Sequence, residues 1–172
     1  MVKKIGITGG SGLIGKILTR ILKKRKIKFS CYKGDVRNFK DIKKWLNSNK
    51  DIKIVYHLAA IVPTIKVIKN KKESINVNYK GTINLYKSIA ELNKDIWFFF
   101  ASTSHVYKPQ DKPLKEKDSI KPTSFYGTTK FMAENWKRIF QKTHQLIIML
   151  FRMYNFDKDL VTIKKLLKIR IF

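Results

Sequence analysis

The sequence predicts an α/β fold, a doubly wound parallel sheet with helices on both faces, and three observations support this class. Strand-like and helical segments alternate along the chain, the order that produces parallel strands joined by right-handed crossovers. The strand-like runs are almost continuously apolar, as expected of strands covered on both faces. A glycine-rich stretch joins the first strand to the first helix, at the edge where such sheets bind ligands.

The bulk composition bounds the class of protein. The chain has 172 residues, of which 44% are apolar, so it can form one domain with a core. Its single cysteine excludes an intramolecular disulfide and favours a reducing compartment. The longest apolar runs, 96–101 and 146–151, fall far short of the roughly 20 residues that cross a membrane, and the sequence shows no signal-peptide pattern. We therefore expect a cytoplasmic protein without a membrane segment, and we predict no metal site.

The net charge of +26 has two interpretations. Nucleic acids and acidic membrane surfaces attract such chains. However, only six of the 38 basic residues are arginine, which is the residue favoured where phosphates or base edges are held by two hydrogen bonds. The lysines are also spread along the chain rather than gathered in one stripe. We interpret the charge as compositional drift and expect no specific nucleic-acid partner.

The glycine-rich stretch 8–15 follows a short strand at 4–8 and opens onto a helical pattern. Gly9 suits a sharp turn, Gly12 lets the backbone approach a phosphate, and Gly15 lets the helix pack closely on the sheet. The free N–H groups at the start of the helix would then face the anion. A plain tight turn is the alternative, but the position between strand and helix favours a dinucleotide site.

The first half of the chain is predicted to contain three strands and two helices. Apolar residues at helical spacing from Leu13 to Leu22 predict a helix that ends in the basic run 23–26. A second stripe, which includes Phe39 and Ile42, predicts the next helix. The other elements are a strand at 27–32, a turn at 34–38, a polar run at 47–50 that closes the second helix, and a strand at 51–58.

The second half continues the alternation. A long helix is predicted at about 72–93, because apolar residues recur there at helical spacing after Pro63 interrupts the chain. A strand at 96–102 follows, and then a polar loop with three prolines. The last elements are a helix from 126 to about 143 and a strand at 146–151.

Two stretches carry residues suited to proton transfer. Tyr126 and Lys130 are four residues apart on one helix face, where an ammonium group would lower the pKa of a neighbouring phenol and make it a better base. Such a pair also occurs by chance in a lysine-rich chain. Thr103 lies at the carboxyl end of a strand, where its hydroxyl could bind the same substrate oxygen. A simple hydroxyl turn that closes the strand is the alternative.

Together these stretches resemble the extended short-chain dehydrogenase/reductases, in the NAD-dependent epimerase/dehydratase family, over residues 1 to about 155. The family's motifs occur in the family's order along the chain. They are the glycine stretch at 8–15, GDVRN at 34–38, HLAA at 57–60, NYKGT at 78–82, STS at 102–104, PTSFYGTTK at 122–130 and RMYN at 152–155.

The resemblance implies a Rossmann-like fold, NAD or NADP as the cofactor and a nucleotide sugar as the substrate. The cofactor-binding residues that it implies are Gly9, Gly12, Leu13, Ile14, Gly15, Asp35, Val36, Leu58, Ala59, Ala60, Asn78, Tyr126 and Lys130. The catalytic residues that it implies are Thr103, Tyr126 and Lys130. The substrate-binding residues that it implies are Thr103, Ser104, Ser124 and Asn155.

The function implied is that of an NAD(P)-dependent epimerase, dehydratase or reductase. Tyr126 would take a proton from a sugar hydroxyl while a hydride passes to the nicotinamide. Lys130 would hold the ribose and lower the pKa of Tyr126, and Thr103 would orient the sugar oxygen. These residues do not separate oxidoreductase, isomerase and lyase reactions. The alternative is a catalytically inactive dinucleotide-binding module that serves as a sensor or a partner subunit.

The sequence departs from the family where strand 27–32 ends. Tyr32 and Lys33 stand where the family has the acid that holds the ribose hydroxyls of NAD. Asp35, 20 residues beyond Gly15, could bind either the ribose or the adenine end. Lys33 and Arg37 would instead suit a 2′-phosphate, so NADP stays open, although we favour NAD. The family's second crossover helix and third strand are missing from the predicted order.

We assign residues 1–155 to a dinucleotide-binding domain that carries the catalytic residues, and residues 156–172 to a short basic tail. The tail does not resemble the family's substrate domain. We therefore expect a truncated form that lacks the last strand and the nucleotide-sugar pocket.

The family commonly forms dimers through two helices, which here are those at 72–93 and 126–143. A homodimer is therefore an expectation for this chain. Leu85, Ile89, Phe131 and Met132 could form its face, unless they complete the core.

Overall fold

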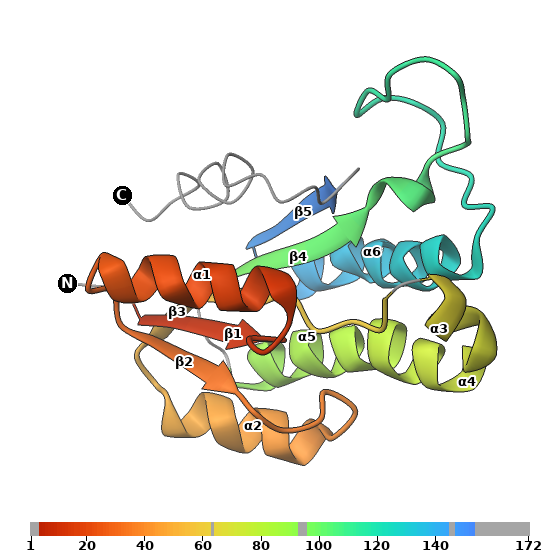
Figure 1. Cartoon of the computed structure of the whole chain (residues 1–172). Coiled ribbons are helices and arrows are strands. Elements are labelled where there is room, and N and C mark those ends of the chain that lie inside the picture. Colours follow the sequence, from red (N-terminus) through yellow and green to blue (C-terminus); the bar gives the residue numbers. More distant parts are fainter. Residues whose placement is uncertain (1–3, 63, 93–95, 145–146, 154–172) are drawn as a thin grey trace.

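The computed structural model describes residues 4–62, 64–92, 96–144 and 147–153 (Figure 1). Within them, five parallel strands form one sheet in the order β2-β1-β3-β4-β5. This confirms the predicted fold class. The strands are β1 (Lys4–Thr8), β2 (Phe29–Tyr32), β3 (Ile52–His57), β4 (Trp97–Thr103) and β5 (Ile147–Met153).

Helical segments connect the strands and cover both faces of the sheet (Figure 1). They are α1 (Leu13–Lys24), α2 (Phe39–Ser48), α3 (Thr64–Lys69), α4 (Lys71–Ser74), the π-helix η1 (Ile75–Lys80), α5 (Gly81–Glu91), the 3₁₀ turn η2 (Ser104–Val106) and α6 (Phe125–His144). None of the helices in the described ranges is both long and apolar enough to cross a membrane.

The strands are apolar along their length because each buries side chains on both faces. Val55 and Phe98 pack in the cluster that includes residues of α2, α5 and α6. Tyr56 and Phe99, the next residues along the same two strands, pack in the cluster that includes residues of α1. This alternation with period two explains the continuous apolar runs of the sequence.

β2 forms one edge of the sheet, as expected from the absence of the family's third strand in the predicted order. The described residues contain no strand beyond β2, and the chain passes from Tyr32 through the turn at 34–38 directly into α2. Tyr32 pairs with Thr8, so the end of β2 lies beside the start of the glycine stretch. The turn after β2 is therefore placed at the ligand-binding edge of the sheet.

The segment between β3 and β4 differs from the prediction in two details. The helix α3 was missed, because six residues make too few turns to show a clear apolar stripe. The helix predicted at about 72–93 is confirmed as a continuous helical segment, but it consists of α4, the π-helical η1 and α5. A π-helical turn shifts the side-chain register within a helix, and such turns are frequent at functional sites.

Two residues proposed for a dimer face belong to the core. Leu85 and Ile89 are 0% and 1% exposed and pack in the cluster with α2, α5 and α6. Burial against the sheet leaves neither side chain available to a second copy. Phe131 and Met132 are half-buried, so the homodimer stays a prediction without the first pair.

A buried ion pair joins α6 to the last two strands. Both carboxylate oxygens of Glu134 accept from the Arg152 guanidinium, with Nη2–Oε2 at 2.7 Å and Nε–Oε1 at 3.1 Å. The Ser102 hydroxyl donates to Glu134 Oε1 at 2.5 Å, and Arg152 Nη1 donates to the Tyr107 hydroxyl at 2.8 Å. The Glu134 side chain is only 3% exposed. The hydrogen bonds therefore compensate the cost of burying the carboxylate.

We predict that Glu134→Gln lowers the free energy of unfolding by about 3 kcal/mol, because the Arg152 guanidinium loses its paired charge in a largely buried place. Glu91→Gln is the matched control. Glu91 pairs with Lys43 at 2.8 Å, but both side chains are exposed, so its loss should cost less than about 1 kcal/mol. Urea unfolding followed by circular dichroism measures both, and equal losses would contradict this account.

Candidate functional site

The glycine stretch makes close backbone contacts that no larger residue allows. Gly9 has a φ of +72°, and a Cβ there would lie 2.5 Å from the amide nitrogen of Ala59. A Cβ on Gly15 would lie 2.3 Å from the carbonyl oxygen of Gly9. Gly12 differs, because a Cβ there would meet only Gly9 O at 3.3 Å. Gly9 and Gly15 therefore let the loop pack closely on the end of β3 and on the start of α1, whereas the space beside the Gly12 Cα is largely open.

The start of α1 is suited to bind an anion. Its N-cap is Gly12, which has no side chain to accept a hydrogen bond from the first N–H groups, and the first turn contains no acid. The backbone N–H groups of Leu13 and Ile14 belong to this first turn, where N–H groups lack intrahelical partners. The Leu13 side chain is 61% exposed, so Leu13 offers the site its backbone rather than its side chain.

A cavity of about 760 Å³ extends from the glycine stretch along β2. This volume is within the range of small-molecule and cofactor sites. The structure thus brings together residues that the sequence places far apart. The predicted cofactor residues that line the cavity are Gly9, Gly12, Asp35, Val36, Leu58, Ala59 and Ala60.

The turn after β2 holds the carboxylate of Asp35 in place. Asp35 Oδ1 accepts from the Arg37 backbone N–H at 2.8 Å, and Oδ2 accepts from Arg37 Nε at 2.7 Å. The hydrogen bonds from Arg37 hold the pKa of Asp35 below its usual value, although partial burial acts in the opposite direction. Arg37 Nη1 also lies 3.6 Å from Glu73. Arg37 is therefore engaged by two carboxylates, which disfavours the 2′-phosphate role considered for it.

Asn84 on α5 is a site residue that the sequence did not reveal. Its side-chain amide donates to the carbonyl oxygens of Val36 and Arg37, at 3.1 and 3.0 Å. These two bonds fix the turn from α5, a distant element in the sequence. The only sequence signal was a polar residue inside an apolar helix pattern, which is too weak to predict the contact.

A chain of hydrogen bonds crosses the ligand-binding edge of the sheet through His57. The Thr82 hydroxyl donates to the Asn78 carbonyl at 2.8 Å, so it accepts from His57 Nε2 at 2.9 Å. His57 Nδ1 then accepts from the Thr8 hydroxyl at 2.6 Å. Thr8 Oγ1 in turn accepts from the Ala59 N–H at 3.4 Å. We therefore assign a neutral His57 with its hydrogen on Nε2.

Asn78 lies in η1 and connects three parts of the site. Its Oδ1 accepts from the Ile61 N–H at 2.7 Å, and its Nδ2 donates to the Ile61 carbonyl at 3.3 Å. Nδ2 also lies 3.3 Å from the Thr129 hydroxyl of α6. The side chain is buried, so its direct role in the described structure is to hold the segment after β3 against α6.

Close packing holds the start of α6 against the end of β4. A Cβ on Gly127 would lie 2.2 Å from the His105 carbonyl oxygen, and the rings of Tyr126 and His105 are in contact with centroids 5.9 Å apart. Thr103 is buried, and its hydroxyl oxygen accepts from the His105 N–H at 3.3 Å. The alternative turn role of Thr103 is therefore present, and its hydroxyl hydrogen is still a donor for a ligand.

Ser104 and Ser124 lie close to this edge. Ser104 is half-buried and starts η2 directly after Thr103. Ser124 Oγ accepts from the Gly127 N–H at 3.0 Å, which makes Ser124 the N-cap of α6. Asn155 and the tail at 156–172 lie outside the described residues.

Lys130 is buried beneath the predicted catalytic edge. It is 1% exposed, and its Nζ lies 4.2 Å from the centroid of the Phe100 ring. Burial lowers the pKa of Lys130 to about 7, and the Glu134 carboxylate opposes this shift. Burial also raises the pKa of Tyr126 to about 12.

The pKa of Tyr126 is thus shifted opposite to the sequence expectation. Spacing alone predicted that Lys130 would lower it. Burial instead disfavours both the phenolate form of Tyr126 and the ammonium form of Lys130, which raises the first pKa and lowers the second. An additional positive charge beside the phenol would be needed to favour the phenolate.

A cavity at a glycine turn after the first strand, together with a buried threonine and lysine and a half-buried tyrosine on β4 and α6, is typical of the extended short-chain dehydrogenase/reductases. Residues 21–163 match the family described as GDP-mannose 4,6 dehydratase, and the chain belongs to this family. An Arabidopsis thaliana bifunctional UDP-glucose and UDP-xylose 4-epimerase is 32% identical over 123 residues, which cover 71% of this chain.

Two solved structures have the same fold. UDP-glucuronic acid 4-epimerase from Bacillus cereus, in complex with NAD, has a TM-score of 0.77 and 25% identity over 88% of this chain. RMD from Pseudomonas aeruginosa, in complex with NADPH, has a TM-score of 0.80 and 20% identity over 89% of this chain. The chain covers 35% of the Arabidopsis protein and 56% and 53% of these two structures, so it spans about half the length of the proteins it matches, or less.

We predict that His57 makes the protein less stable as the pH falls below about 6.5. Burial, with a smaller effect of Lys130, holds the pKa of His57 well below its usual value of 6.5. The unfolded chain therefore binds a proton that the folded chain does not. The stability is complete above pH 6.5 and falls by about 1.4 kcal/mol per pH unit below it.

Urea unfolding at several pH values between 6.5 and 5 measures this slope. His57→Gln should remove this part of the slope, whereas His105→Gln, at an exposed position, is the matched control and should keep it. A wild-type slope no steeper than that of His57→Gln would show that His57 is protonated in the folded protein.

Proposed function

We propose that this chain binds NAD or NADP in the cavity at the glycine stretch and carries the proton- and hydride-transfer residues of a nucleotide-sugar epimerase, dehydratase or reductase. The observation that carries the proposal is the juxtaposition of two features at one edge of the sheet. One is the open N-terminus of α1 with its cavity, and the other is the Thr103, Tyr126 and Lys130 set on β4 and α6.

The residues present fit a dinucleotide. Gly12 leaves open the side of the loop that a Cβ would partly fill, and the first N–H groups of α1 suit a pyrophosphate. The small residues Ala59 and Ala60 line the same cavity and leave room for a flat ring system. A bound nicotinamide dinucleotide supplies the acceptor or donor of a hydride. The structures in complex with NAD and NADPH support this assignment by their common fold.

The chain's own residues would move and hold the proton. The Tyr126 phenol would take the proton of a substrate hydroxyl, or return it to a carbonyl. The Thr103 hydroxyl keeps a hydrogen to donate to the same substrate oxygen, because its contact with His105 uses only a lone pair. Lys130 would hold a ribose hydroxyl and stabilise negative charge on the phenol. Because burial holds the pKa of Tyr126 near 12, proton transfer needs this support.

A dinucleotide-binding module without turnover is the second candidate, and one observation favours it. Burial raises the pKa of Tyr126 to about 12, which is opposite to the shift that makes a phenol a better base. Such a module would bind the cofactor as tightly as an enzyme does. The two candidates therefore differ in turnover and not in cofactor binding.

We predict that NADH or NADPH binds the folded chain and that Gly12→Val weakens this binding at least tenfold. A valine would fill the open side of the loop where the pyrophosphate must approach. Isothermal titration calorimetry measures the affinity. The control is Lys44→Ala on the exposed surface of α2, outside the cavity, and its affinity should equal that of the wild type. Failure of both cofactors to bind would reject the proposal.

The position of the bound cofactor can be tested through Cys31. This is the single cysteine of the chain, and it lines the cavity at half exposure. We predict that saturating cofactor slows alkylation of Cys31 by iodoacetamide several-fold, because the ligand covers the thiol. Mass spectrometry follows the reaction. An unchanged rate under saturation would place the ligand elsewhere.

A turnover assay distinguishes the enzyme from the dinucleotide-binding module without turnover. If the chain converts UDP-, GDP- or dTDP-sugars, Tyr126→Phe should reduce the rate at least a hundredfold while cofactor affinity stays within a few-fold of wild type. Cofactor binding without any turnover by the wild-type chain would support the module instead.

A further inference from the structure

NAD and NADP differ at the 2′ position of the adenosine ribose, which is a hydroxyl in NAD and a phosphate in NADP. The residues of the cavity that contact this position therefore decide which cofactor binds. In dinucleotide-binding sheets this position is recognised after the second strand, by an acid for a free hydroxyl or by a cation for a phosphate. The residue directly after β2 in this chain is Lys33. Its side chain is exposed, and it lines the cavity.

The register of the sheet fixes where Lys33 stands. Tyr32 pairs with Thr8, the residue before Gly9, so Lys33 follows the end of β2 at the level where the glycine stretch begins. Tyr32 itself is committed to the turn, because its hydroxyl donates to the Asp35 carbonyl at 2.9 Å and its ring packs on Trp45. Lys33 is therefore the charged residue at the end of the strand.

Asp35 is the one acid that could replace the missing ribose ligand, and its carboxylate is already engaged. Both of its oxygens accept hydrogen bonds from Arg37, and the two side chains form an ion pair. Asn84 fixes the turn that holds them. The Arg37 charge offsets the carboxylate that would otherwise repel a phosphate. No ion pair to Lys33 is found among the described residues.

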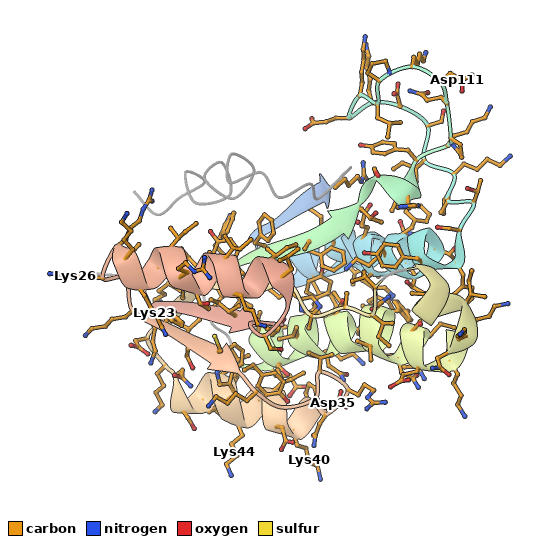
Figure 2. All side chains as sticks on the ribbon, in the orientation of Figure 1. Lys23, Lys26, Asp35, Lys40, Lys44 and Asp111 are labelled. Carbon is orange, nitrogen blue, oxygen red and sulfur yellow. The ribbon has the colours of Figure 1, made fainter. Side chains whose placement is uncertain are left out.

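The pKa of Cys31, which lines the same cavity as Lys33, shows the electrostatic effect of the nearby lysines. Burial raises the pKa of the Cys31 thiol, and the nearby ammonium groups of Lys33 and Lys23 partly offset that rise. Both lysines thus act on the cavity interior. They occupy different ends of it, because Lys23 belongs to the last turn of α1, at the opposite end of the helix from the glycine stretch (Figure 2).

We propose that Lys33 is a 2′-phosphate ligand and that this chain prefers NADPH to NADH. This inference rests on the proposed function, and it reverses the preference for NAD drawn from the sequence. The Lys33 ammonium would donate a charge-assisted hydrogen bond to the phosphate, which the 2′-hydroxyl of NADH cannot match. Lys33 is thus a specificity-determining residue for the cofactor, with Arg37 acting only through Asp35.

Titration calorimetry with NADPH and NADH in about 0.3 M salt tests the proposal, because salt suppresses the general attraction of a chain of charge +26 for anions. The wild-type chain should bind NADPH about ten- to a hundredfold more tightly than NADH. Lys33→Ala should bring the ratio of the two affinities close to one. Lys33→Glu should favour NADH, since a carboxylate accepts from ribose hydroxyls and repels the phosphate.

Lys23→Ala is the matched control. Lys23 lines the same cavity and carries the same charge, but at the far end of α1, so its loss should leave the preference for NADPH within about twofold of wild type. Equal losses for Lys23→Ala and Lys33→Ala would show diffuse attraction and overturn the assignment of Lys33. Equal or tighter binding of NADH by the wild type would overturn the preference itself. Binding of neither cofactor would reject the proposed function.

Discussion

The close approach of the glycine stretch to the end of β3 is the constraint on which the rest of the site depends. A side chain at Gly9 would clash with the backbone of Ala59, and one at Gly15 would clash with Gly9. This tight contact lets α1 start at the ligand-binding edge of the sheet, where its first N–H groups have no side-chain cap. The cavity, the turn after β2 and the small residues after β3 are all arranged around that start.

Two buried polar networks hold the other side of the site in register. One passes through the neutral ring of His57 and reaches Asn78, which fastens the segment after β3 to α6. The other joins Glu134, Arg152 and Ser102, and so fixes α6 against β4 and β5. Both networks hold α6 in position, and we assign no catalytic step to their members. Lys130 lies on the same helix as Glu134, and its burial lowers its pKa.

The sequence predicted the features that depend on local pattern. The five strands, the glycine stretch and the Tyr126–Lys130 spacing could all be recognised, because apolar runs and short motifs are continuous in the chain. Contacts between distant residues could not, which is why Glu134 and Asn84 were missed. The direction of the Tyr126 pKa was wrong for a related reason. Spacing shows that a lysine is near, but burial, which decides the charge of both groups, is set by the whole fold.

If the N-terminus of α1 binds the pyrophosphate of a nicotinamide dinucleotide, a crystal structure of this chain grown with NADPH should show where the cofactor lies. Phosphate density should lie within hydrogen-bond distance of the backbone N–H groups of Leu13 and Ile14, with the adenosine along the β2 side of the cavity. A cofactor bound away from the glycine stretch, with no phosphate at the start of α1, would show that this helix is not the pyrophosphate site.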